Sequence, residues 1–297
     1  MAHLRRGLIA ILTLGLAIAF ETSVRADIGG GTTKGGARVM LTKEATQALG
    51  REVLESPPQG PKVEFASTAF CGKQPGDAGA DDLCPMAVVR CEANSDPEGK
   101  GPAVSVFSRL VTLAGQPVPG RDGQWRGRGA TCFPQYVPGA SKALTMVMIR
   151  DAFHDTDFSV PTVNIQPEGD VTLVNLPTFF EVQFPSSGFG PDEVDTPDPA
   201  RLLGYRIEVR PRLTSITYHL GTTTIGPTTS LGGPYPSGDI RAVYRQPGDQ
   251  QVRADIVYSG QFRVGGSEWF DIPGTVDLEG TPVTLTVREA TSRLYTH

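Results

Sequence analysis

The sequence contains only four histidines, and it lacks the common motifs of serine hydrolases and nucleotide-dependent enzymes. There is no G-x-S-x-G elbow, no phosphate-binding loop and no dinucleotide-binding fingerprint. A Ser-His-Asp triad needs a histidine oriented by a carboxylate. His154 lies near the end of a predicted helix, His219 on the predicted solvent face of a strand, and His297 at the chain end. No pair of histidines has the H-x-x-x-H spacing of a metal site. The sequence therefore predicts no catalytic residue, no metal ligand and no cofactor.

Long apolar runs are also missing, and the one at the start is short. Arg5 and Arg6 precede Gly7–Phe20, an uncharged and mostly apolar run of 14 residues, and Val24-Arg25-Ala26 offers small residues for cleavage. As a helix this run would span about 21 Å, less than the ~30 Å hydrocarbon core of a bilayer. We expect residues 1–26 to be a signal peptide; an uncleaved anchor is the alternative. The mature chain is then expected to be secreted, extracellular or in the cell envelope, without a transmembrane segment.

Excess positive charge is absent as well. The sequence has 27 Lys and Arg against 32 Asp and Glu, a formal net charge of −5. An acidic chain gives no electrostatic support for binding nucleic acid. We therefore expect no nucleic-acid partner.

Cysteine is scarce, and none occurs in a C-x-x-C pair. Cys71, Cys84, Cys91 and Cys132 are an even set, which in an exported chain predicts two disulfides; a zinc site is the alternative. Four cysteines allow three pairings. Alternation over residues 63–68 predicts a strand, and Met86–Cys91 resembles the next one. If these strands form a hairpin, Cys71 and Cys84 lie at the base of its loop, which favours the pairs Cys71–Cys84 and Cys91–Cys132.

Glycine and proline are abundant and together make up about a fifth of the chain, which suits a β-rich protein with many turns. Residues 27–60 are expected to be a partly ordered leader, with a short helix over Leu41–Leu54 as the alternative. Residues 61–137 are expected to form a disulfide-containing β-rich module. Residues 138–160 are expected to be a helical connector. Its helix, Pro138–Asp157, would be capped by Ser141 and would bury an apolar stripe that includes Ile149 and Phe153.

Residues 161–297 show the period-two pattern of half-buried antiparallel strands. Frequent turn signals separate these segments, which favours a β-sandwich. The alternating or apolar segments are 171–177, 179–184, 205–210, 216–220, 252–258 and 283–287. We therefore predict a mainly β protein, in which a disulfide-stapled β-rich module and one helix precede a C-terminal β-sandwich.

Two resemblances concern this second half. Tyr218-His219-Leu220-Gly221, followed by Tyr244, Gly248 and Val252–Val257, resembles a degenerate PKD domain, an extracellular immunoglobulin-like sandwich. Tyr218 stands where that family has an inward-facing Trp, while His219, Thr222 and Thr223 replace its acidic and glycine positions. The resemblance implies an immunoglobulin-like sandwich whose usual acidic motif is not kept.

The mature chain is also similar to a group of secreted actinobacterial proteins of unknown function. The similarity covers roughly 140–297 well and 61–137 weakly. It is carried by Val171–Pro177, by Gly232-Gly-Pro-Tyr-Pro236 and by Trp269-Phe-Asp-Ile-Pro-Gly-Thr-Val276. This resemblance implies export and a cell-envelope context, and it supplies no catalytic residues.

Three surface features are candidates for binding. Trp125 lies beside Arg126 and Arg128 in a Gly-rich loop, a composition enriched in binding surfaces; pinning of the loop is the alternative. Arg206, Arg210 and Arg212 share one strand face that could meet an anionic wall polymer or simply be solvated. The loop Asp192–Asp198 is rich in carboxylates that could bind calcium, although it matches no D-x-D-x-D-G loop.

These observations favour a secreted, non-catalytic cell-envelope protein. It would act as a binding or spacer module for wall carbohydrate or for another envelope protein. The alternatives are an extracellular hydrolase that uses paired carboxylates, and an accessory subunit that is inert alone.

Overall fold

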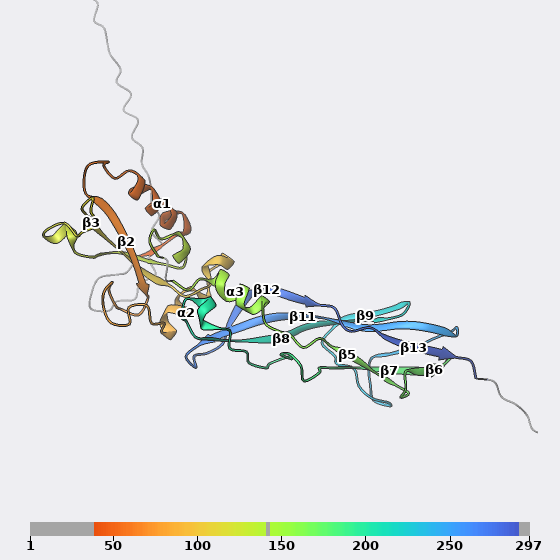
Figure 1. The fold of residues 1–297 in the computed structure, drawn as a ribbon. Helices are drawn as coiled ribbons and strands as arrows, with labels where there is room; N and C mark the ends of the chain where they lie inside the picture. Colours follow the sequence, from red (N-terminus) through yellow and green to blue (C-terminus); the bar gives the residue numbers. More distant parts are fainter. Residues whose placement is uncertain (1–38, 141–142, 291–297) are drawn as a thin grey trace, which may run out of the picture.

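The computed structural model describes residues 39–140 and 143–290 and is mainly β. Figure 1 shows an N-terminal part at one end and long strands that extend from it to the other end. The predicted signal peptide, the beginning of the predicted leader, Ser141 and His297 lie outside the described residues.

The N-terminal part contains a four-stranded sheet in the order β1-β4-β3-β2. Its strands are β1 (Met40–Leu41), β4 (Arg126–Thr131), β3 (Val104–Val111) and β2 (Lys62–Ala69). Helix α1 (Lys43–Leu54) begins after Thr42, whose hydroxyl accepts a hydrogen bond from Ala45 N. Leu49 of α1 is buried with Phe65 and Val106 of the sheet. The short helix weighed for Leu41–Leu54 therefore forms and packs on the module.

One predicted strand is wrong. Met86–Cys91 lies within helix α2 (Pro85–Glu92), where Ala87, Val88 and Cys91 are buried while Met86 and Val89 are exposed. This is the spacing of one helix face, and Pro85 in the first turn costs no hydrogen bond. A short apolar run does not distinguish a buried strand from a helix, so the pattern alone was ambiguous.

Both disulfides nevertheless have the expected pairing. Cys71 is bonded to Cys84 just before α2, and Cys91 of α2 is bonded to Cys132 after β4. Because the predicted hairpin does not exist, the first bridge joins the end of β2 to the start of a helix.

The predicted helix of residues 138–157 is shorter than expected. Helix α3 spans Met146–His154 and is capped by Thr145, whose hydroxyl accepts a hydrogen bond from Met148 N. Ile149 and Phe153 are buried, as the apolar stripe predicted. Four short 3-10 turns complete the helical elements of the described chain: η1 (Pro97–Gly99), η2 (Arg121–Gly123), η3 (Pro134–Tyr136) and η4 (Pro199–Leu202).

The C-terminal part contains two further sheets. A three-stranded antiparallel sheet has the order β10 (Arg241–Val243), β7 (Pro177–Gln183), β5 (Thr162–Gln166). A six-stranded sheet contains β6 (Val171–Leu173), β13 (Val283–Arg288), β11 (Gly248–Val264), β8 (Ile207–Leu220), β9 (Thr223–Thr228) and β12 (Phe270–Leu278). All its pairs are antiparallel except β13 with β6.

The two C-terminal sheets share one apolar core, an arrangement consistent with a β-sandwich. Phe180 of the small sheet and Tyr218, Leu220 and Ile256 of the large sheet belong to the same buried cluster. Val88 of α2 belongs to it as well. The N-terminal part is therefore joined to the C-terminal sheets by packing as well as by the chain.

Candidate functional site

The predicted Trp125 surface consists of side chains that already have partners. The guanidinium of Arg109 lies 4.2 Å from the centroid of the Trp125 ring, and its Nε donates to Glu64 at 2.6 Å. Arg126 pairs with Asp122 at 2.6 Å, and Arg128 pairs with Glu52 of α1 at 2.7 Å. These contacts fasten the loop to the module and leave no convergent set of donors.

The arginines of β8 are engaged in a similar way. Arg210 stacks on Trp269 at 4.2 Å and donates two hydrogen bonds to Gln261 Oε1, while Arg212 pairs with Asp192. Arg263 of β11 lies 4.6 Å from the same Trp269 ring and pairs with Glu208. Most arginines on this face are therefore held by contacts within the protein, and the face presents fewer unpaired cations than the sequence predicts.

The carboxylates of the Asp192–Asp198 loop point to separate partners. Glu193 accepts from Gly190 N, Asp195 from Thr156, and Asp198 from Ala200 N as the cap of η4. Among residues 39–140 and 143–290, no three His, Cys, Asp or Glu side chains form a group that could hold a metal ion. The structure thus gives the calcium hypothesis no converging ligands.

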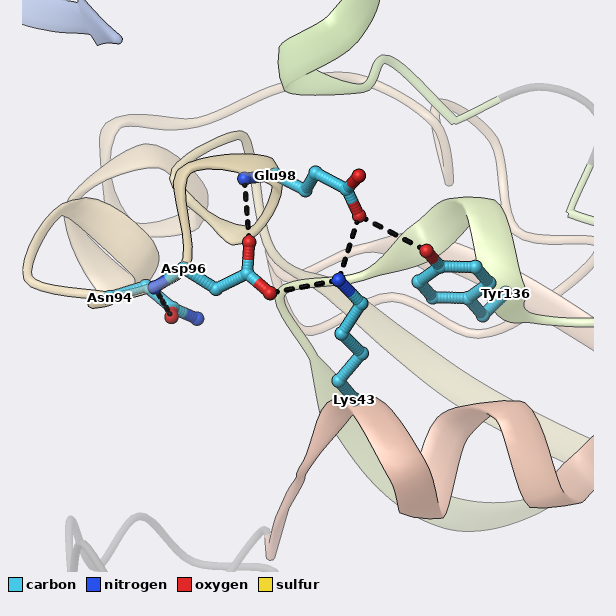
Figure 2. Close-up of polar contacts among 5 residues, drawn as sticks. All are labelled: Lys43, Asn94, Asp96, Glu98 and Tyr136. Carbon is cyan, nitrogen blue, oxygen red and sulfur yellow. Dashed lines mark hydrogen bonds and ion pairs between the residues drawn. The ribbon is translucent and has the colours of Figure 1, made fainter.

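A charged cluster at the start of α1 joins three segments of the N-terminal part (Figure 2). Lys43 Nζ lies 2.9 Å from Asp96 Oδ2 and 3.0 Å from Glu98 Oε2, and Tyr136 donates to Glu98 at 3.0 Å. The hydrogen bonds from Lys43 to Asp96 and Glu98 raise the pKa of Lys43 above its ordinary value. Lys43 in turn lowers the pKa of both carboxyls, with the Tyr136 hydroxyl a further cause at Glu98. A cation at a helix N-terminus opposes the helix dipole, so the two acids offset that repulsion. The cluster is a structural clamp with satisfied charges.

An apolar groove with open polar groups lies instead at the end of the three-stranded sheet. Its volume is about 670 Å³, within the usual range of ligand sites. Three chain segments line it: the end of β5 and its turn, the start of β7, and the loop that leads into β10. The lining residues are Gln166, Pro167, Glu168, Leu176, Pro177, Phe179, Tyr235, Pro236 and Arg241.

The register of the small sheet places three of these residues in one row. Gln166 of β5 and Arg241 of β10 both pair with Phe179 of β7. Directly opposed residues lie on the same face of a sheet, and their neighbours Ile165, Phe180 and Ile240 belong to the core. The row therefore lies on the outer face, away from the large sheet.

The loop before β10 covers part of this outer face. Gly232 has a φ of +77° and lies so close to β7 that an added Cβ would come within 2.0 Å of Phe180 O. Tyr235 N donates to Gln166 Oε1 at 2.8 Å, which holds the loop to β5. The Tyr235 ring then packs on Phe179, which is why this outward residue is buried.

The open part of the groove is apolar. Tyr235 is 71% exposed and Leu176 37%, and both line the groove. Single exposed apolar residues are normal, but a contiguous group of them is a feature of binding surfaces. The apolar side chains thus provide a surface on which an apolar ligand can lie.

Two charged side chains flank this surface. Glu168 and Arg241 are exposed, and neither has a hydrogen bond or an ion pair within the part of the chain that the structure describes. Four of the five arginines in the two surfaces predicted from the sequence do have side-chain partners within the described residues, and Arg206 is the exception. The four are Arg126, Arg128, Arg210 and Arg212. Glu168 is the single carboxylate among the lining residues, so the groove does not offer the carboxylate pair used in glycoside hydrolysis.

Sequence reasoning missed this site. The segment Gly232–Pro236 carries a family resemblance in the sequence, but that pattern gives Tyr235 no role of its own. The available signal in the sequence was an aromatic residue, Tyr235, between Pro234 and Pro236.

Comparisons with known proteins found no matching family model, no matching curated protein and no matching solved structure. Across residues 39–140 and 143–290, no helix is both long enough and apolar enough to cross a bilayer.

Proposed function

We propose that this chain is a secreted, non-catalytic protein of the cell envelope that binds a protein or a wall carbohydrate in the groove around Tyr235. The single observation that carries the proposal is the open apolar surface of this groove, flanked by the unpaired side chains of Glu168 and Arg241. Pockets of this kind, mostly apolar with a few polar groups, are the usual form of a ligand site.

Two further observations support the location. Structural disulfides persist in oxidising compartments and are rare in the cytosol, and both disulfides here lie in the N-terminal part. The start of the sequence has the charge and apolarity of a secretory signal. The resemblance to secreted proteins of the cell envelope points in the same direction.

The long body of the molecule suits presentation of the groove. The groove lies on the C-terminal sheets, away from the N-terminal part, which occupies the other end of the molecule (Figure 1). The shared core, which includes Val88 of α2, keeps the two parts together. This arrangement would keep the groove at a distance from any surface that the N-terminal part binds.

The test is a binding screen with the full exported chain, carried out on arrays of wall-type glycans and of short peptides. We expect at least one ligand that the wild type and a Leu54→Ala variant bind equally and that a Tyr235→Ala variant does not. Leu54 is the matched control because it is 84% exposed and lies on α1, outside the groove. The proposal is overturned if no ligand on either array depends on Tyr235, or if the bound ligand is chemically converted.

A further inference from the structure

The two unpaired charges of the groove lie on opposite sides of β7. Gln166 and Arg241 belong to the two strands that flank β7, and both pair with Phe179. Neighbouring strands are ~4.8 Å apart, so the backbones at these two positions are separated by about 10 Å. Glu168 follows Gln166 by two residues in the turn after β5. The groove therefore offers a negative group on one side and a positive group on the other, across an apolar middle.

This pair of charges favours a ligand with charges of its own. A ligand that covers the groove removes water from Glu168 and Arg241, and the loss is expensive unless each charge gains an opposite partner. A neutral sugar supplies only hydroxyl dipoles. A ligand with one cationic and one anionic group, set to match the groove, supplies a full partner to each side and also fixes its direction of binding.

The apolar middle of the groove favours a ligand chain that has compact, rigid side chains between its two charged groups. Tyr235, Leu176 and three prolines form this surface, and Phe179 closes its floor. Proline-rich peptides dock in aromatic-lined grooves with a low entropic cost, because their extended polyproline II conformation is already formed before binding. A peptide of this kind rises 3.1–3.4 Å per residue, so about three residues span the ~10 Å between the strand positions of Gln166 and Arg241.

We infer that the groove binds an extended peptide segment of a partner protein. The segment carries a basic residue that meets Glu168, an acidic residue that meets Arg241, and apolar or proline residues between them that lie on Tyr235. The two charged residues are about three positions apart. This inference rests on the proposed function and chooses protein, rather than carbohydrate, as the ligand class.

The first experiment uses fluorescein-labelled peptides and the full chain, with binding followed by fluorescence anisotropy. The probes are Gly-Lys-Pro-Leu-Glu-Gly and its charge-reversed counterpart Gly-Glu-Pro-Leu-Lys-Gly, because the polarity of the bound chain is open. We expect one of the two to bind at least tenfold more tightly than the other, and more tightly than versions with two Gln, two Lys or two Glu. Equal binding of all five peptides overturns the inference.

The second experiment exchanges the charges on the protein. Glu168→Lys and Arg241→Glu should each weaken the preferred peptide at least tenfold, and the double variant E168K/R241E should prefer the charge-reversed peptide. The control E44K/R121E makes the same exchange at two exposed positions in the N-terminal part and should leave both affinities unchanged. A double variant that fails to change the preference overturns the inference.

Failure of this inference is distinguishable from failure of the proposed function. A neutral glycan that needs Tyr235 and is indifferent to charge reversal at Glu168 and Arg241 leaves the proposed function in place and overturns the peptide. The absence of any ligand that depends on Tyr235 overturns both.

Discussion

The rings of Tyr235 and Phe179 meet edge to face, with centroids 5.5 Å apart and an interplanar angle of 81°. Phe179 is 5% exposed and Tyr235 is 71% exposed. Phe179 is therefore part of the packing of the sheet, whereas Tyr235 is part of its surface. Single substitutions can measure the two contributions to stability separately.

Phe179→Ala should destabilise the protein by about 3–5 kcal/mol, as is usual for a buried Phe. Tyr235→Ala should cost about 1 kcal/mol, chiefly the lost ring pair. Urea unfolding followed by tryptophan fluorescence gives both values, and the midpoint should move much further for the first variant. Similar losses for the two variants would mean that Tyr235 is part of the core and not a free binding surface.

Two buried tyrosines of the C-terminal core differ in their hydrogen bonds. Tyr218 donates to Ser230 O at 2.9 Å, whereas the Tyr258 hydroxyl is buried without a partner in the described part of the chain. An unpaired buried hydroxyl costs about 1–3 kcal/mol. We expect Tyr258→Phe to raise the free energy of unfolding by about 1 kcal/mol and Tyr218→Phe to lower it by about the same amount.

Thermal and urea unfolding of these two variants measure the difference directly, because both changes remove one oxygen from a fully buried ring. The prediction fails if Tyr258→Phe is destabilising. That result would show that the hydroxyl has a partner, such as an internal water molecule.

The sequence predicted the elements whose signal is local and periodic. Tyr218 and Ile256 lie on alternating segments, and both are buried in the sheets that this alternation predicted. The stripe of Ile149 and Phe153 likewise predicted a helix. The disulfide pairing was correct although its argument was wrong, since Cys71 and Cys84 are close in sequence whether a hairpin or a helix follows.

The groove could not be predicted in the same way. Glu168, Phe179 and Arg241 are brought together by strand register, and the sequence does not state which strand pairs with which. The merging of two predicted segments into the single long strand β8 was missed for a related reason. Pro211 lies inside β8, and a proline between two alternating runs suggests a break unless a bulge or sheet edge is known.

The disulfide Cys91–Cys132 should contribute more stability than Cys71–Cys84. It joins residues 41 apart in sequence and the other joins residues 13 apart, which corresponds to about 4 and about 3 kcal/mol in the chain-entropy model. Cys91 is also buried on α2, the helix that places Val88 in the large core.

The paired variants C91A/C132A and C71A/C84A test this order by urea unfolding without reductant. The first should lose more free energy of unfolding, and its C-terminal tryptophan, Trp269, should report an earlier transition because Val88 is released. A larger loss in the second variant would contradict the predicted order.

The Lys43 cluster should make part of the stability depend on pH in acid. Bonds to Lys43 lower the pKa of Asp96 and Glu98 in the folded state, so these carboxyls bind protons more readily when the chain is unfolded. Their contribution is present above their ordinary pKa, about 4, and is lost as the pH falls through the lowered folded values. Lys43 itself stays charged throughout this range, because even the ordinary pKa of a lysine lies far above it and the pKa of Lys43 is raised further. We therefore expect Lys43→Met to be less stable than the wild type at pH 6 and to lose less stability between pH 5 and pH 2.

Lys62→Met, an exposed position on β2, is the matched control and should keep the acid dependence of the wild type. Urea midpoints measured across this range decide the matter, since parallel curves for the wild type and Lys43→Met would mean that the cluster makes no pH-dependent contribution to stability.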